Sequence, residues 1–476
     1  MKSTLLTTLF SAVVALASFG PNIRIDHQNN PEGALLWPAI AVGPSTGSVQ
    51  PVYVVFQYDS TWIGSRADVM FQKSTDAGRT WLPTDVIARR GDPGAGEPDI
   101  TTDPDGNIYV VYYEHRDTSN HLYCVLSTDG GAMWSQPTKV DDRVRGGMGL
   151  IRIAADSAGY LLCAWNDSRT GSSHIWSSVS TDRGATWSQN VRVDEDTTNM
   201  DCAHADVFVQ PGTNHYLVAA SVPYYDGHSG GYNCYLYRST DMGQTFQPGV
   251  RLDTSGAAGP HVVADAQHVV CDYIDGSNVE ARTLYTQPDT WGTPHSVGSS
   301  WQAGGLAISA DGLVHAVLQA RPPGGGPYYA YYAFSSDHGF SWSDLEPANN
   351  DTNAEAYDPA IAADSAGHVY IVWRDLRTGV LWFATNNPAA IAEEPMRQPI
   401  SAQPSANVVR GVLFLAACPS ASTSSLLDIS GREVMDLKPG ANDVSRLSPG
   451  VYFIKGQGSR SQRSEGSRVT KVVVTR

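Results

Sequence analysis

Ionisable side chains gather at one repeated place in this chain, just before short strands that share an aligned Ile or Val. They lie one or three positions before that residue: Glu97, Asp99, Arg152, His204, Asp206, His261 and Asp358. Carboxylates can transfer protons, and arginine and histidine can bind anionic or polar groups. A scaffold position would favour one residue type in every copy. We therefore expect these unlike residues to form a ligand-binding patch; the alternative is the polar lining of a water-filled channel.

Three further arginines follow a carboxylate by two residues. The pattern is aromatic-x-acid-x-Arg, and its arginines are Arg116, Arg169 and Arg377. The first interpretation is a local ion pair that stiffens a loop, worth about 0–1 kcal/mol if exposed. The second is a guanidinium clamp for a carboxylate on a ligand. Two aromatic-rich loops, 223–232 and 321–329, are expected on the same face and suit the flat faces of sugars.

One acidic segment, Asp194-Glu-Asp-Thr-Thr-Asn-Met-Asp201, carries oxygen ligands of the kind that Ca²⁺ prefers. Its spacing matches no known calcium-binding loop, so solvated surface charge is the favoured interpretation. The sequence predicts no other metal centre and no cofactor.

A short motif, which we call the Asp box, recurs along the chain. The fold that it defines must position these side chains. Its copies are STDAGRTW (74–81), STDGGAMW (127–134), STDRGATW (180–187), STDMGQTF (239–246) and SSDHGFSW (335–342). The Asp can accept hydrogen bonds from the turn that it begins, the Gly supplies a positive φ, and the aromatic residue anchors the unit. Each copy therefore predicts the tip of a hairpin, pinned by its own aromatic residue. Residues 285–291 keep an Asp and a Trp without the Gly, as in a degenerate copy.

The boxes recur roughly every 50 to 60 residues, with one interval of about two periods, which is typical of propeller blades. A second motif, an inner hairpin with an Asp or Gly turn, occurs seven times upstream, as at 100–110, 153–162 and 361–370. The last hairpin has no fourth strand after it. Asn22-Ile-Arg-Ile-Asp26 resembles the fourth strands elsewhere and can complete that sheet. We predict an all-β, seven-bladed β-propeller with this closure, and six blades as the alternative.

The boxes and inner hairpins together resemble the sialidase superfamily with its BNR (Asp-box) repeats, over residues 22–390. The resemblance implies a β-propeller fold and leaves activity open, because this fold hosts many functions. Hairpin parity places the boxes at one face. The starts of the inner strands and the loops between second and third strands lie at the other, where a ligand would bind.

Sialidases bind the substrate carboxylate with three arginines and use an Asp as acid/base and a Tyr nucleophile assisted by a Glu. The first arginine of the family lies in an Arg-Ile-Pro element, and Leu36 occupies its position here. This departure argues against sialic acid cleavage. We therefore predict an exported propeller that binds a glycan or protein. The alternatives are an exo-acting glycosidase, sialidase-like or using two of Glu97, Asp99, Asp206 and Asp358, and a purely structural envelope module.

Both ends of the chain predict export. Residues 1–17 read as a signal peptide, with Lys2, an apolar run and a small-x-small cleavage site. A linker at 391–404 precedes a small β-sandwich domain at 405–476. That domain closely resembles the type A sorting domain of the type IX secretion system, through its D-x-x-G-R-x-V, G-V-Y-F and K-x-V-V elements. The resemblance implies the type IX machinery as a partner, and secretion or display on the outer surface of a Gram-negative bacterium.

Composition excludes some partners. The formal net charge of −16 argues against nucleic acid, which proteins bind mainly by neutralising phosphates. After the leader, no apolar stretch reaches the roughly 18 residues of a spanning helix. The six cysteines are widely spaced. They are either small core residues or include one or two disulfides, since export permits both.

Overall fold

The computed structural model describes residues 19–28, 34–47, 50–59, 67–89, 94–116, 119–143, 148–197, 200–225, 230–286, 289–300, 302–322, 324–350, 355–391, 407–409, 412–415, 424–438, 440–456 and 469–474. These residues fall into two compact units that divide between Ile391 and Ala392. The leader predicted at 1–17 lies outside the described residues, as does the predicted linker apart from Ile391.

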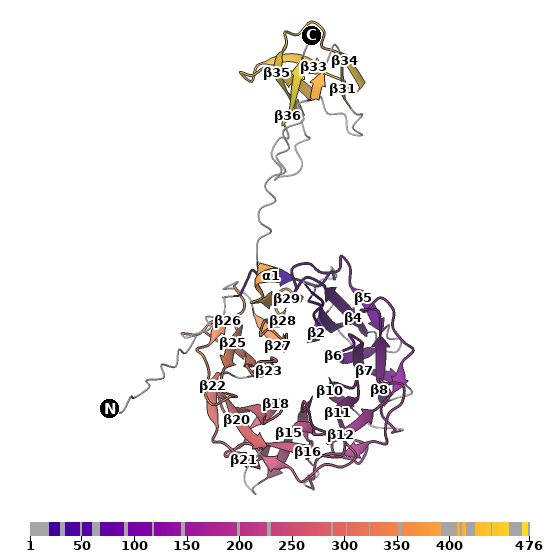
Figure 1. Cartoon of the computed structure of the whole chain (residues 1–476), viewed down its shortest axis with the longest axis vertical. Coiled ribbons are helices and arrows are strands. Elements are labelled where there is room, and N and C mark those ends of the chain that lie inside the picture. Colours follow the sequence, from indigo (N-terminus) through magenta and orange to yellow (C-terminus); the bar gives the residue numbers. More distant parts are fainter. Residues whose placement is uncertain are drawn as a thin grey trace, which may run out of the picture. The chain divides into compact units, whose positions relative to one another are not determined.

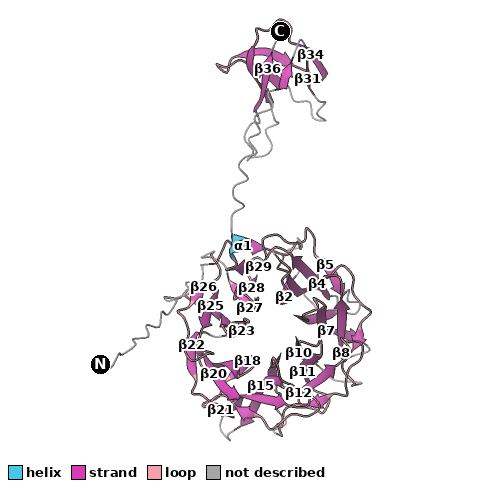
Figure 2. Cartoon of the chain, viewed as in Figure 1, coloured by secondary structure: helices cyan, strands magenta, loops and turns pink. Residues whose placement is uncertain are grey.

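The first unit is a β-propeller, a ring of antiparallel sheets (Figures 1 and 2). We number its seven sheets 1 to 7 by their innermost strands, which are β2 (Ala34–Val42), β6 (Ala95–Thr102), β10 (Met148–Ala155), β14 (Ala203–Val209), β18 (Ala258–Ala264), β23 (Gln302–Ile308) and β27 (Ala356–Ala363). The second strands are β3 (Val52–Asp59), β7 (Ile108–Arg116), β11 (Leu161–Asp167), β15 (Tyr216–Tyr225), β19 (His268–Asp275), β24 (Val314–Ala320) and β28 (Val369–Asp375). The innermost strands contact one another in cyclic order, and β27 contacts β2.

The third strands are β4 (Ala67–Ser74), β8 (Ser119–Ser127), β12 (His174–Ser180), β16 (Gly230–Ser239), β20 (Asn278–Thr286), β25 (Tyr329–Ser335) and β29 (Val380–Thr385). The outermost strands are short: β5 (Val86–Arg89), β9 (Thr138–Lys139), β13 (Val191–Arg192), β17 (Val250–Arg251), β22 (His295–Ser299), β26 (Glu346–Pro347) and, for sheet 7, β1 (Ile23–Arg24). A four-residue helix, α1 (Pro388–Ile391), follows β29.

The prediction that the N-terminal strand completes the last sheet is confirmed. Strand β1 pairs antiparallel with β29, with Ile23 opposite Phe383. Asp26 then accepts the backbone N–H of Leu381 at 2.7 Å, as Asp253 accepts that of Cys234 at 2.8 Å in sheet 4. The N-terminal segment therefore makes the same bonds as a fourth strand, because it carries the same residues at the same spacing.

Each Asp box folds as the same hydrogen-bonded turn. In the first copy, the hydroxyl of Ser74 donates to Asp76 and accepts from the Gly78 N–H, and the Thr80 N–H donates to Asp76 at 2.8 Å. The other four copies repeat these three bonds. Both residues after the Asp have positive φ, as at Ala77 and Gly78.

The box glycine and aromatic residue pack on the preceding sheet, which corrects the expectation that each box pins only its own hairpin. Trp134 lies edge-on to Phe71 of sheet 1, with ring centroids 5.2 Å apart. A Cβ on Gly131 would lie 2.3 Å from the same Phe71 ring. The box is therefore also a joint between neighbouring sheets.

The degenerate copy in sheet 5 forms a different turn. Strand β21 (Asp289–Trp291) pairs back onto β20, with Leu284 opposite Trp291. A short hairpin thus replaces the box, and β22 pairs with β20 beyond it.

Strand register separates two ends of every sheet. In sheet 2, Ala95 at the start of β6 lies opposite Glu114, and Arg116 lies opposite Ser119 at the next turn. At the other end, Ile108 lies opposite Ser127, where the Asp box begins. We call the end with the inner-strand starts the site face and the other end the box face. The predicted separation of the boxes from the candidate site residues follows from this register.

The cores lie between adjacent sheets. Strands β11 and β24 are buried along their whole length, because both of their faces meet a neighbouring sheet. Cys124, Cys163, Cys202, Cys234 and Cys271 are buried free thiols, which confirms the core interpretation for these five. Cys418 lies outside the described residues.

The second unit is small and all β in its described residues. One sheet has the order β30 (Asn407–Val409), β36 (Val469–Val474), β35 (Gly450–Gly456), β32 (Ser424–Leu427) and β33 (Glu433–Leu437). Strands β31 (Val412–Leu415) and β34 (Gly440–Asp443) form a second sheet. Both sheets contribute to one apolar core, which includes Leu413, Leu426, Leu437, Val444 and Tyr452. The D-x-x-G-R motif is a tight turn, in which Asp428 accepts the N–H groups of Ser430 and Arg432.

Among the described helices, none has the length and apolar character required to cross a membrane.

Candidate ligand-binding site

A β-bulge near the start of each innermost strand positions the candidate residues. The register of each strand shifts there, at or beside a residue with positive φ. These residues are Trp37, Glu97, Leu150, His204, Gly259, Gly305 and Asp358. A left-handed backbone costs an L-residue about 1–2 kcal/mol, so the ring imposes this conformation whatever the side chain. Bulges often re-aim side chains beside functional sites.

Arg152 of β10 is the common neighbour of the central residues. Its Nε lies 3.9 Å from a carboxylate oxygen of Asp206, and its side chain is 42% exposed. Its positive charge also acts on Glu97, Asp99 and His204. The structure thus brings together predicted residues from sheets 2 to 5, with a half-exposed guanidinium among them. We call Glu97, Asp99, Arg152, His204, Asp206 and His261 the central cluster.

Three carboxylates of the central cluster bond the next sheet. Glu97 accepts the backbone N–H of Leu150 at 2.5 Å, and Asp99 accepts that of Ile153 at 2.8 Å. Asp206 accepts the N–H of Val262 at 2.9 Å. An innermost strand has an unpaired edge, and these oxygens satisfy its N–H groups.

The same carboxylates are poorly hydrated. Burial raises the pKa of Asp99 to about 6, against the effect of Arg152 and of the Ile153 N–H. Burial also raises the pKa of Glu97 and of Asp206, with Arg152 opposing in both cases. The carboxyl group of Asp99 can therefore be protonated near pH 6.

The two histidines of the central cluster differ. The surrounding protein excludes water from His204, which disfavours the charged imidazolium. Together with the charges of Arg152 and His261, this lowers the pKa of His204. Burial opposes protonation of His261 as well, but Asp272 lies 2.9 Å from its Nδ1 and raises the pKa of His261 above the usual value. His261 is thus the better cation of the two.

Asp358 stands apart from the central cluster. Its carboxylate pairs with Arg374 at 3.0 Å on sheet 7. Beside it, Tyr357 lies edge-on to Tyr328, and Arg321 lies over the Tyr328 ring at 4.5 Å. Sequence analysis missed Arg374 and Tyr357; the signal available was their place in the inner hairpin that carries Asp358.

The local ion-pair interpretation is confirmed for two of the three loop arginines. Arg169 makes a 2.7 Å pair with Asp167 and a 2.6 Å pair with Asp142, and its guanidinium lies over Trp176. Arg377 pairs with Asp375 at 3.0 Å. These guanidinium groups brace their own loops. The side chain of Arg116 lies outside the described part of the structure.

The acidic segment 194–201 is partly buried, so its interpretation as solvated surface charge is wrong for Asp194 and Asp196. Asp194 and Asp196 are buried. Asp194 accepts the Ile175 N–H and contacts the Nδ1 of His174 at 3.0 Å. Asp201 accepts the Ser173 N–H at 2.7 Å.

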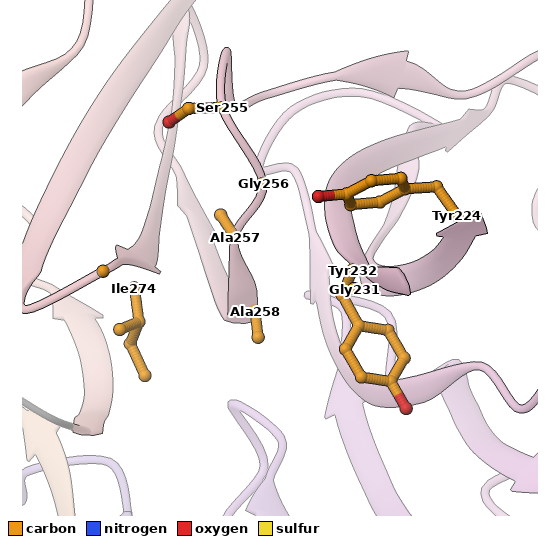
Figure 3. Close-up of a pocket in the computed structure, with 9 residues that line it drawn as sticks. Tyr224, Gly231, Tyr232, Ser255, Gly256, Ala257, Ala258 and Ile274 are labelled. Carbon is orange, nitrogen blue, oxygen red and sulfur yellow. The ribbon is translucent and has the colours of Figure 1, made fainter. Parts of the chain in front are cut away.

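An open cavity of about 320 Å³ lies on the site face, between sheets 4 and 5. Its lining combines the tyrosines at the ends of β15 and β16 with the segment that leads into β18 and with Ile274 (Figure 3). Figure 3 shows the rings of Tyr224 and Tyr232 on one side and Ile274 on the other. Ala258, which lines the cavity, is three residues before His261 on β18.

No protein-family model matches the chain, and no curated protein matches it. Solved structures of similar fold include a protein of unknown function from Dyadobacter fermentans, with 14% identity over 78% of this chain and 99% of that one and a TM-score of 0.48. An alpha-L-arabinanase of Penicillium chrysogenum has 13% identity over 78% and 96% of the two chains, with a TM-score of 0.46. A sialidase of Streptococcus pneumoniae has 11% identity over 78% and 71%, with a TM-score of 0.43.

Proposed function

We propose that the propeller binds a glycan on its site face without cleaving it, which narrows the prediction of a glycan or protein ligand. The observation that carries this proposal is the use of Glu97, Asp99 and Asp206 as acceptors for backbone N–H groups of the next sheet. Each of these carboxylates uses one oxygen to hold a strand of the next sheet, so each has a structural role that requires no chemistry. Arg152 is the half-exposed cation left to bind a polar ligand group.

The tyrosine-lined cavity supplies the second half of the proposed site. Tyr224 and Tyr232 offer flat rings and hydroxyl groups, which suit the apolar faces and the hydroxyls of a sugar. Tyr225 extends the aromatic surface and is 64% exposed. A glycan that stacks on these rings would direct a polar or acidic substituent toward Arg152.

An exo-acting glycosidase is the second candidate, and one observation favours it. The pKa of Asp99, raised by burial to about 6, suits a general acid near neutral pH. Glu97 lies two residues away on the same strand and accepts from the same neighbouring sheet. This pair would be the acid and its partner if turnover is found.

The wider assignment is also a proposal. We infer a seven-bladed member of the sialidase superfamily, supported by the seven sheets and by the repeated Asp-box turns. We infer export through the type IX system, supported by the signal-like residues 1–17 and by the sorting-domain motifs of the second unit. The described residues of the second unit form a separate small β unit, which fits this role.

The test combines a glycan array with a panel of fluorogenic glycosides, sialosides included, on the purified chain. We expect array binding without turnover, and a loss of about tenfold or more in affinity for Arg152→Ala and for Tyr232→Ala. Arg183→Ala is the matched control, because Arg183 is a half-exposed arginine on the box face. Turnover that disappears in Asp99→Asn would establish the glycosidase instead. Absence of both binding and turnover would overturn the proposal.

A further inference from the structure

Two histidines and an aspartate converge on the box face, between sheets 5 and 6. Asp265 and His268 belong to the inner turn of sheet 5, and His338 follows the Asp of the box in sheet 6. The Nδ1 atoms of His268 and His338 lie 3.1 and 3.0 Å from the same oxygen, Oδ2 of Asp265. The imidazole rings stack, with centroids 3.8 Å apart and 16° between their planes.

The hydrogen bonds of Asp265 divide its two oxygens. Oδ1 accepts the backbone N–H groups of Gln267 and His268, each at 2.7 Å. The backbone bonds thus hold the carboxylate in orientation, and Nδ1 of His268 lies 3.1 Å from both of its oxygens.

His338 is incompletely satisfied. Its Nδ1 is buried and has no hydrogen-bond partner, although Oδ2 of Asp265 is only 3.0 Å away. The carboxylate oxygen is close enough to bond but lies outside the direction that a hydrogen bond requires. A buried imidazole nitrogen without a partner calls for an explanation, and an ion bound between the three groups provides one.

We propose that Asp265, His268 and His338 bind a divalent transition metal, with Zn²⁺ as the best-fitting ion. Their ligand atoms all lie within 4.8 Å of one another. A tetrahedral zinc ion with bonds of about 2.0–2.1 Å separates its ligands by roughly 3.3 Å. The 3.0 and 3.1 Å separations between each Nδ1 and Oδ2 are slightly shorter than this value, and the stacked rings must turn out of their parallel arrangement before both nitrogens can bind one ion. Two imidazoles and one carboxylate suit zinc, copper or iron rather than calcium.

The bound ion would link two sheets, and its fourth coordination position would remain open. Asp265 and His268 come from sheet 5 and His338 from sheet 6, so the ion would cross the joint between them. A Cβ on Gly312 would lie 3.3 Å from Cε1 of His338 and 4.0 Å from Oδ2 of Asp265. The missing side chain at Gly312 leaves room for water as the fourth ligand.

Another joint makes a related contact without histidines. Arg183, at the box position that matches His338, pairs at 2.5 Å with Asp105 in the inner turn of sheet 2. The residue after the box Asp thus reaches the preceding inner turn in both joints. At one joint the pair is Arg and Asp, and at the other it is His with Asp and a second His.

The test uses the full chain without a histidine tag, stripped with a chelator and titrated with Zn²⁺ by calorimetry and with Co²⁺ by absorption spectroscopy. We expect one tight ion per chain and tetrahedral Co²⁺ bands. His338→Ala and His268→Ala should each weaken Zn²⁺ binding about 100-fold or more, whereas Arg183→Ala should bind like the wild type. Ca²⁺ should not compete.

Thermal unfolding gives a second measurement, whose wild-type result requires no variant. Zn²⁺ should raise the Tm of the wild type and leave the Tm of His338→Ala unchanged. The proposal is overturned if the wild type takes up no zinc, or if both histidine variants bind as tightly as the wild type. In either case the three groups are a metal-free His-Asp-His cluster.

Discussion

On the box face each Asp bonds its own turn, whereas on the site face three carboxylates bond the neighbouring sheet. Asp76 accepts the N–H of Thr80, four residues later, and Asp99 accepts the N–H of Ile153, in another sheet. A bond within a turn requires the same residue wherever the turn occurs. A bond between sheets can be made in other ways, and Ser221 accepts the N–H of Gly259 in place of a carboxylate. Repetition of the box Asp therefore marks a local turn, and variation among the carboxylates of the site face marks hydrogen bonds between sheets.

The two groups of carboxylates also differ in acidity. Partial burial opposes the charge of Asp76, but hydrogen bonds from Thr80 and Ser74 hold the pKa of Asp76 below its usual value. On the site face burial prevails, and the pKa values of Glu97, Asp99 and Asp206 rise. Lowering the pH should therefore weaken the hydrogen bonds of the box turns. On the site face it should remove the cost of burying charged carboxylates.

The largest expected effect tests the box as a joint between sheets. In Gly131→Ala the new methyl group would lie 2.3 Å from the buried Phe71 ring, at a φ of +87°. We expect a loss of about 3 kcal/mol in the free energy of unfolding, from overpacking and backbone strain together. Gly47→Ala is the control, since its φ is +65° and its Cβ would meet nothing within 4 Å. Urea unfolding followed by tryptophan fluorescence compares them. Equal losses in the two variants would mean that packing on the preceding sheet does not matter.

An intermediate effect tests the difference in acidity. The folded state holds the Asp99 proton with a pKa of about 6, above the value of about 3.9 in the unfolded chain. The free energy of unfolding should therefore fall as the pH rises through this window, by about 1–2 kcal/mol. Asp99→Asn keeps an acceptor for the Ile153 N–H and removes this fall. Urea unfolding at pH 4 to 7 measures both proteins. Parallel pH profiles would show that Asp99 is not the titrating group.

The smallest effect concerns an exposed contact on the box face. Arg183 and Asp105 are both largely exposed, so Arg183→Ala should cost about 0–1 kcal/mol in stability. The difference should shrink further at high salt, because ions screen such pairs. Thermal unfolding at two salt concentrations measures it. A loss well above this range would show that the joint between sheets 2 and 3 depends on this pair.

Much of the fold could be predicted because local motifs encode it. The closing strand at residues 22–26 could be identified because Asp26 bonds a third strand as Asp253 does. The positive φ of Trp37 and Leu150 could not be predicted, because the ring imposes it on residues that avoid it. Nor could the grouping of His338 with Asp265, since only the packing of sheet 6 on sheet 5 brings them together.

The candidate site was predicted less completely than the fold. The central cluster holds six of the predicted residues, because the aligned position faces one end of the ring in every sheet. Asp358 is held by Arg374 instead, and Arg169 and Arg377 brace their loops. Spacing along the chain indicates which face a residue occupies. It does not indicate which residue of opposite charge will form an ion pair with it.

The pairing of Ile23 with Phe383 imposes an order on synthesis. Strand β1 leaves the ribosome before most of the ring, so it stays unpaired until its partner β29 has been synthesised. The entropy of closing so long a loop grows only slowly with length, so the delay costs time more than stability. A truncated chain would keep an open sheet edge at both ends, and such edges invite aggregation. The ring can therefore close only after translation of the propeller has finished.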